Sequence, residues 1–166
     1  FEGTIAWREE KSALPGHDGS KVHDTWEIFI RKDGKTHKVD EGELIQSSSE
    51  YDIFPMPQRL SLYGDYLVYR AYGQIPGSRD EGIVIKLYDI KKDSHRTIFS
   101  LKNADKYYVS DPCIYKDYVV WSTGELEMAR RGIVKKGDLY IYNIKTGSYG
   151  KVMEGEDLTD PLIWEQ

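Results

Sequence analysis

The densest group of metal-ligating residue types lies in the polar segment 16–24, which contains His17, Asp18, His23 and Asp24. Neutral imidazole and carboxylate groups both bind divalent metal ions. The spacing of these side chains within one loop-like stretch matches no defined metal site, and a solvated loop explains the same residues. The sequence therefore predicts no cofactor, and these four residues are candidate metal ligands only.

Signatures of common catalytic sites are absent from the sequence. It contains no Gly-x-Ser-x-Gly elbow, no His-Glu-x-x-His pair and no P-loop. The acidic pairs Asp80–Glu81 and Glu156–Asp157 lie in expected loops. Acid–base catalysis requires two acids that converge in space with separated pKa values, and no spacing in the sequence indicates such a pair. An enzyme of glycosidase or lyase type is therefore the alternative hypothesis and not the first.

Charged residues gather in three insertions between expected strands, at residues 9–24, 73–81 and 124–136. Binding residues concentrate in loops carried by a rigid scaffold, so these insertions form the expected binding surface. A solvated charged loop is the alternative interpretation of the third insertion. The candidate binding residues are Glu125, Glu127, Arg130, Arg131, Lys135 and Lys136 in the third insertion, and Arg79 and Asp80 in the second.

The composition fits a single globular domain of 166 residues, with 39% hydrophobic and 31% charged residues. The net charge of −5 gives no electrostatic basis for binding nucleic acid. No apolar run approaches the length of a membrane span, about 18 residues. The lone Cys113 cannot form an intrachain disulfide and is expected to be a small buried side chain. Because the chain begins at Phe1, we expect either a removed leader or a piece of a longer protein.

Short alternating or apolar runs bounded by Gly, Asp, Asn and Lys predict an all-β protein. An aromatic content of 13%, with 13 Tyr, also favours strands. Only residues 125–131 have the composition of a helical turn, and Gly34 is expected at positive φ in a hairpin turn. The expected strands are residues 3–7, 25–31, 36–39, 59–62, 66–69, 83–90, 96–101, two strands within 111–121, one within 137–147, 149–153 and 160–164.

These strands recur along the chain. Tyr69 and Trp121, like Tyr88 and Tyr142, are separated by roughly 50 residues, and four-stranded repeats of this length are typical of β-propeller blades. Trp7 takes the position of Tyr69 and Trp121, which predicts that all three pack between blades. A β-sandwich is the alternative. The predicted fold is one domain of three four-stranded antiparallel blades, at 1–40 plus 160–166, 52–101 and 107–155, with the first blade split between the termini.

Two segments carry a resemblance to a known family. Residues 111–121 (Asp-Pro-Cys-Ile-Tyr-Lys-Asp-Tyr-Val-Val-Trp) and 137–147 (Gly-Asp-Leu-Tyr-Ile-Tyr-Asn-Ile-Lys-Thr-Gly) resemble the blades of TolB-like β-propellers, and 63–69 matches more loosely. The resemblance implies a bladed ring, often extracytoplasmic or in the cell envelope, that binds proteins or small ligands. In some relatives the propeller belongs to a peptidase or a sugar lyase. The Ser-Pro-Asp-Gly turn common in the family is missing here, and no catalytic residue of the family is carried over.

Closed propellers have at least about four blades, so three blades do not make a ring. Residues 160–166 followed by 1–7 have the spacing of an inner strand and its neighbour, so the last strand is expected to complete the first blade. Two chains joined head to tail would then form a six-bladed ring, whereas a fragment of a longer propeller is the alternative. The expected function is a noncatalytic binding or scaffolding module for a protein or a saccharide-like ligand, without nucleic acid and without membrane insertion.

Overall fold

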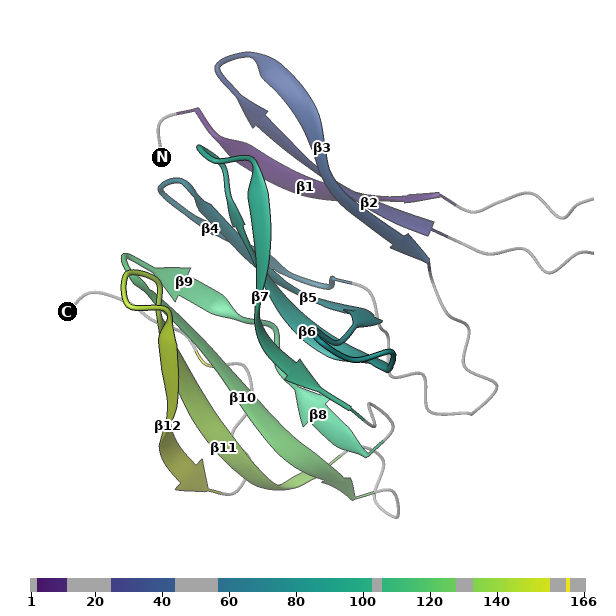
Figure 1. Cartoon of the computed structure of the whole chain (residues 1–166), viewed down its shortest axis with the longest axis vertical. Coiled ribbons are helices and arrows are strands. Elements are labelled where there is room, and N and C mark those ends of the chain that lie inside the picture. Colours follow the sequence, from purple (N-terminus) through teal and green to yellow (C-terminus); the bar gives the residue numbers. More distant parts are fainter. Residues whose placement is uncertain are drawn as a thin grey trace, which may run out of the picture.

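The regular secondary structure of this protein is β-strand throughout the ranges that the structure describes. The computed structural model describes residues 3–11, 25–43, 57–102, 106–127, 133–155 and 161, without the side chains of 126–127 and 133–136. The strands form three antiparallel sheets, which Figure 1 shows stacked one on another. The prediction of an all-β protein is therefore confirmed. Within these ranges no helix is long and apolar enough to cross a membrane.

The first sheet has the order β1-β2-β3. Its strands are β1 (Ile5–Lys11), β2 (Thr25–Lys32) and β3 (Lys35–Glu43). Asp33 and Gly34 join β2 to β3 with φ angles of 51° and 75°, and a two-residue hairpin of this kind requires positive φ at both positions. The predicted conformation of Gly34 is confirmed.

The second sheet is a four-stranded meander, β4 (Leu60–Tyr63), β5 (Tyr66–Gln74), β6 (Glu81–Asp89) and β7 (Ser94–Leu101). The third sheet contains β8 (Tyr107–Val109), β9 (Cys113–Tyr115), β10 (Tyr118–Glu127), β11 (Ile133–Asn143) and β12 (Ser148–Gly155). Both β8 and β9 pair with β10, at different places along it. They are two pieces of one interrupted strand, since Pro112 between them has no N–H to donate to a ladder.

The strands extend further into the expected insertions than the sequence indicates. Gly124 pairs with Gly137 and Leu126 with Val134, so residues 125–127 continue β10 and the expected helical turn there is wrong. The hydrogen-bond ladder between β10 and β11 outweighs a helical composition of only a few residues. Residues 9–11 and 73–74 likewise belong to β1 and β5. Residues 12–24, 128–132, 160 and 162–166 lie outside the described residues, and with them the proposed split of the first blade.

The three sheets share a local irregularity at corresponding positions. In each sheet a β-bulge interrupts the pairing of the last two strands. The residue at each bulge also pairs, on its other side, with a residue of the preceding strand. These pairs are Phe29 with Trp7, Lys86 with Tyr69, and Tyr140 with Trp121. Since bulges re-aim a strand at a defined point, this recurrence indicates that the sheets are copies of one structural unit.

The turns of the second and third sheets are also alike. The side-chain oxygen of Asp89 accepts hydrogen bonds from the N–H groups of the second and third residues after it, and that of Asn143 does the same. The N–H of Ile90 donates to the carbonyl of Asp65 at 2.8 Å, and the N–H of Ile144 donates to that of Asp117 at the same distance. The short polar side chains fix the turn, which explains why Asp and Asn recur here.

Apolar side chains on both faces of the second sheet form the core. One face packs against the first sheet, and the other packs against the third sheet. This double burial accounts for the unbroken apolar run 83–85 in β6. The cluster between the first and second sheets contains Trp26, Ile28, Ile30, Leu67, Tyr69, Ala71, Val84 and Tyr88, and the cluster between the second and third contains Val68, Ile83, Ile85, Leu87, Ile98, Val109, Ile114, Val119, Trp121, Tyr142 and Ile144.

The predicted packing role of the recurrent aromatic residues is confirmed for two of them. Tyr69 and Trp121 are fully buried between sheets. Trp7 differs, because it lies half-buried on the face of the first sheet that has no described sheet against it. Cys113 is also half-buried, which corrects the expectation of a buried thiol. Trp26 is a core residue with 2% of its surface exposed.

The sheets converge along one edge. β4, the first strand of the second sheet, contacts β1 of the first sheet and β9 of the third. Figure 1 shows the β5–β6 connection on the right. The end of β1 and the start of β2 lie on the same side, as do the end of β10 and the start of β11, whereas the short turns lie on the left. The β5–β6 connection therefore lies on the same side of the stack as these strand ends.

Candidate functional site

A pocket of about 450 Å³ opens between the second and third sheets, where β10 ends and β11 begins. Its volume falls within the range of small-molecule sites, roughly 300–1,000 Å³. Five strands contribute to it, because β7 faces β8, β10, β11 and β12 at this point. The lining residues are Phe99, Ser100, Leu101, Tyr107, Thr123, Gly124, Glu125, Gly137, Asp138, Tyr140, Lys151 and Glu154.

Aromatic rings form one wall of this pocket. The ring of Tyr140 stacks on the buried indole of Trp121, with centroids 5.7 Å apart and planes 10° apart. Phe99 approaches Tyr140 from the second sheet with a centroid distance of 5.7 Å. Tyr149, 56% exposed, lies 6.2 Å from Tyr140 at the outer edge of the cluster. Because Trp121 fixes Tyr140 from behind, the wall presents a rigid aromatic surface.

Charged groups stand beside that wall. The hydroxyl of Tyr140 donates to Asp138 at 3.2 Å, and the Lys151 ammonium lies 3.3 Å from Asp138 and 3.2 Å from Glu154. Burial, reinforced by the negative charge of Asp138, raises the pKa of Tyr140. Hydrogen bonds to Glu154 and Asp138 raise the pKa of Lys151, so its ammonium stays charged. Three carboxylates, including that of Glu125, thus line the pocket against one ammonium.

This combination suits a particular ligand chemistry. A flat aromatic wall attracts the C–H faces of a ring, and carboxylates accept hydrogen bonds from hydroxyl groups. The excess of negative charge disfavours phosphate and other anionic ligands. No set of three or more His, Cys, Asp or Glu side chains in the described ranges is arranged to hold a metal ion. The candidate metal ligands His17, Asp18, His23 and Asp24 lie outside those ranges.

Only part of the predicted binding surface meets at this pocket. Glu125 lines it, as an exposed residue of β10. Asp80 lies in the β5–β6 connection, where it pairs with Lys102, the residue after Leu101 of the pocket. That hydrogen bond from Lys102 lowers the pKa of Asp80. Arg79 is exposed in the same connection. Arg130 and Arg131 lie outside the described residues, and so do the side chains of Glu127, Lys135 and Lys136, whose backbones belong to β10 and β11.

The sequence prediction missed most of the pocket. Asp138, Tyr140 and Lys151 were assigned to strands without a functional role. Strand alternation contains a usable signal, since Asp138 and Tyr140 are two residues apart and must share a face. That face is the one carrying Trp121, because Trp121 pairs with Tyr140. The contribution of Phe99 from another sheet has no signal in the sequence.

A second, smaller pocket of about 280 Å³ lies beside the interrupted strand β8–β9. Gln58, Arg59, Arg70, Tyr108 and Asp111 line it. The guanidinium of Arg70 donates to the carbonyl of Val109, and its Nε lies 3.4 Å from Asp111. With only 11% and 13% of their side chains exposed, Arg70 and Asp111 join the second sheet to the third. Since Arg70 is already engaged by protein groups, this cluster stabilises the sheet contact and is not the favoured ligand site.

A third pocket, of about 530 Å³, lies near the turns at the other end of the strands. Its charged residues are Lys32, Asp65 and Lys91. Lys32 lies 3.0 Å from Asp65, and Lys91 lies 2.6 Å from it. Hydrogen bonds from Lys91 and then Lys32 lower the pKa of Asp65. Tyr63 is its single aromatic side chain, so it lacks the stacked wall of the first pocket.

A polar cluster also lies between the first and second sheets, at the position that corresponds to the aromatic wall. The hydroxyl of Tyr69 and the ammonium of Lys86 each donate to Asp40 at 2.7 Å. Burial and the charge of Asp40 raise the pKa of Tyr69. Here Lys86 takes the place of Tyr140, and its ion pair with Asp40 ties the two sheets together. The open aromatic pocket is therefore a feature of the junction between the second and third sheets.

Comparison with known protein families, with curated proteins and with solved structures finds no match for this chain.

Proposed function

We propose that the three sheets are blades of a β-propeller of the TolB-like kind, and that the chain is a noncatalytic binding module for a saccharide-like ligand. The recurrent bulge at Phe29, Lys86 and Tyr140 supports the first part. The contacts of β4 with β1 and β9 support it as well, because blades meet at their inner strands.

The observation that carries the ligand proposal is the stacked pair of Trp121 and Tyr140 next to Asp138. A sugar ring can lie on Tyr140 while its hydroxyl groups donate to Asp138 and Glu125. Such a ligand has both the apolar face and the hydrogen-bond donors that this pocket complements. The pocket also lies on the side of the stack that carries the β5–β6 connection and the facing ends of β10 and β11, where the sequence predicts binding residues.

The arrangement favours binding over glycoside cleavage. A general acid for that reaction is a carboxylic acid kept protonated by an apolar environment. Asp138 and Glu154 instead flank the ammonium of Lys151. A cation beside both carboxylates is the opposite of the apolar surroundings that a general acid of this kind requires.

The Asp138→Asn variant tests the proposal. We expect the wild-type chain to bind at least one member of a panel of neutral oligosaccharides in isothermal titration calorimetry. Asp138→Asn should weaken that binding about tenfold, or about 1.4 kcal/mol, because a charged acceptor is replaced by a neutral amide.

Glu41→Gln is the matched control, since Glu41 is a carboxylate on the first sheet with 64% of its side chain exposed. It should bind the same oligosaccharide with unchanged affinity. The proposal fails if no neutral oligosaccharide binds the wild-type chain, or if Asp138→Asn and Glu41→Gln bind equally well.

A further inference from the structure

The outer face of the first sheet, which points away from the second sheet, carries Trp7 and Phe29. Their rings stack with centroids 5.5 Å apart and planes 21° apart. This pair has the same register and nearly the same geometry as Trp121 and Tyr140 of the third sheet. In the third sheet, Trp121 and Tyr140 pack against Phe99 of the second sheet.

Corresponding faces of the second and third sheets therefore make the contact with the preceding sheet. The third sheet packs its Trp121 face against the second sheet, and the second sheet packs its Tyr69 face against the first. The corresponding Trp7 face of the first sheet has no sheet against it in the described part of the chain. A stacked aromatic pair at this position is the feature of a sheet-packing face.

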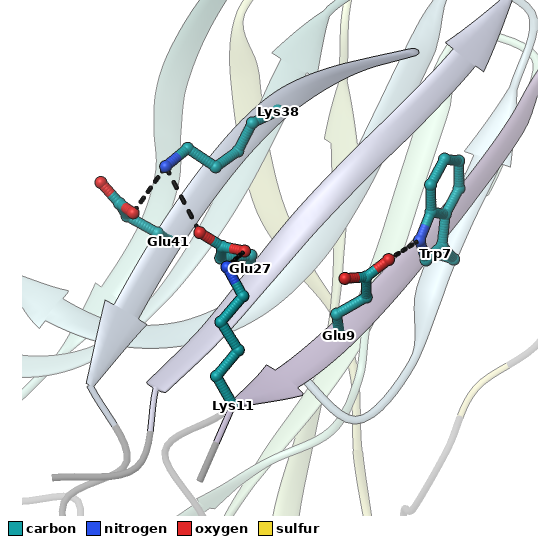
Figure 2. Close-up of polar contacts among 6 residues, drawn as sticks. All are labelled: Trp7, Glu9, Lys11, Glu27, Lys38 and Glu41. Atoms are coloured by element: carbon teal, nitrogen blue, oxygen red, sulfur yellow. Dashed lines mark hydrogen bonds and ion pairs between the residues drawn. The ribbon is translucent and has the colours of Figure 1, made fainter. Parts of the chain in front are cut away.

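Figure 2 shows that the charged groups on this face are paired with one another. Lys38 lies 3.5 Å from Glu27 and 2.7 Å from Glu41, and Lys11 also pairs with Glu27. The hydrogen bond from Lys11 lowers the pKa of Glu27. The indole N–H of Trp7 donates to Glu9 at 2.8 Å. Because Lys11, Glu27, Lys38 and Glu41 pair with one another, covering the face buries ion pairs at these four positions and not isolated charges.

The receiving face is largely aliphatic in both observed contacts, and it also carries Trp26 in the first sheet and Phe99 in the second. In the second sheet it carries Ile85 and Leu87, which face the third sheet. Leu139 and Ile141 hold the corresponding register positions in the third sheet, on the face that points away from the second sheet. Both are half-buried, and the neighbouring Met153, which pairs with Leu139, is 53% exposed. No described sheet packs against this face.

We propose that the Trp7 face of one copy packs on the Leu139 face of a second copy, head to tail. One chain supplies both a sheet-packing face and its complement, at opposite ends of the stack. Such a heterologous contact, made twice, closes two copies into a ring of six sheets. This inference rests on the proposed blade arrangement and is independent of the ligand pocket.

The molar mass in solution tests the proposal directly. Multi-angle light scattering at micromolar concentration should give twice the mass of one chain. Trp7→Glu should raise the dissociation constant of the dimer at least about tenfold, since it places an unpaired charge in the contact. Gln74→Glu, at an exposed position of β5, adds the same charge outside both faces and should leave the mass unchanged. Far-ultraviolet circular dichroism should be the same for all three chains.

A mixing experiment distinguishes this contact between two different faces from a dimer in which one face packs against its own copy. Met153→Glu should impair the receiving face, as Trp7→Glu impairs the donating face. Each variant alone should be monomeric, and an equimolar mixture should form a dimer through the one intact pair of faces. A monomeric wild-type chain, a dimer insensitive to either substitution, another copy number, or a mixture that stays monomeric would each overturn the proposal. Oligosaccharide binding should survive in Trp7→Glu, so a failure here is separable from a failure of the ligand proposal.

Discussion

Replacing Arg70 by Ala should lower the free energy of unfolding by about 3 kcal/mol, because removing one partner of a buried ion pair is strongly destabilising. Arg70 bridges two sheets, through the carbonyl of Val109 and the carboxylate of Asp111. Its loss therefore removes a charged donor from two acceptors at once. Urea denaturation followed by tryptophan fluorescence measures the change.

A double-mutant cycle separates this pair from the rest of the contact. Asp111→Ala alone should also destabilise, and the double variant should lose less than the sum of the two single variants. Arg70→Lys keeps the charge but cannot reach both acceptors with one forked group, so its stability should lie between those of the wild type and Arg70→Ala. Stability of Arg70→Ala within about 0.5 kcal/mol of the wild type would mean that the contact does not join the sheets.

Replacing Trp121 by Ala should cost about 4 kcal/mol, the range typical of a large buried aromatic side chain. Trp121 is fully buried and packs against Phe99 of the second sheet and Tyr140 of its own sheet. The truncation leaves a cavity behind the wall of the ligand pocket. Thermal and urea unfolding of the variant give the free energy directly.

Trp121→Phe is the matched control for that cavity. It keeps a ring on Tyr140, and the indole Nε1 that it removes has no hydrogen-bond partner among the described residues. Its cost should therefore be less than half that of Trp121→Ala. Equal losses for the two variants would contradict the view that ring packing, and not the indole N–H, holds the junction.

The sequence was sufficient to predict the class of fold and most strands. Apolar residues alternate in β2 and are consecutive at 83–85 in β6, and these patterns indicate strands with one or both faces buried. The ends of the long strands are not predicted, since charged residues predominate in 9–11 and 125–127 and give no apolar pattern. β8 was also missed as a separate strand, because three residues before the Ser110–Pro112 interruption are too few to show a period.

The candidate site could not be predicted in full, because the pattern of residues along the chain does not show which faces of the sheets pack against each other. Glu125 was anticipated from its place in an insertion. Asp138 and Tyr140 share a face by alternation, but that this face meets Phe99 of another sheet follows from how the sheets stack. Arg70 lies in an otherwise apolar run, and its ion pair with Asp111 joins residues that are distant in sequence. The contacts of Tyr140 with Phe99 and of Arg70 with Asp111 both follow from the packing of the second sheet against the third.

A two-dimensional ¹H–¹⁵N NMR titration with the tightest-binding oligosaccharide locates the ligand relative to the pocket between β7 and β11. We expect shifts confined to amides around the pocket, at Thr123, Gly137, Asp138 and Lys151. Shifts centred instead on the turns near Asp65 and Lys91, or an unchanged spectrum at saturating ligand, would contradict it.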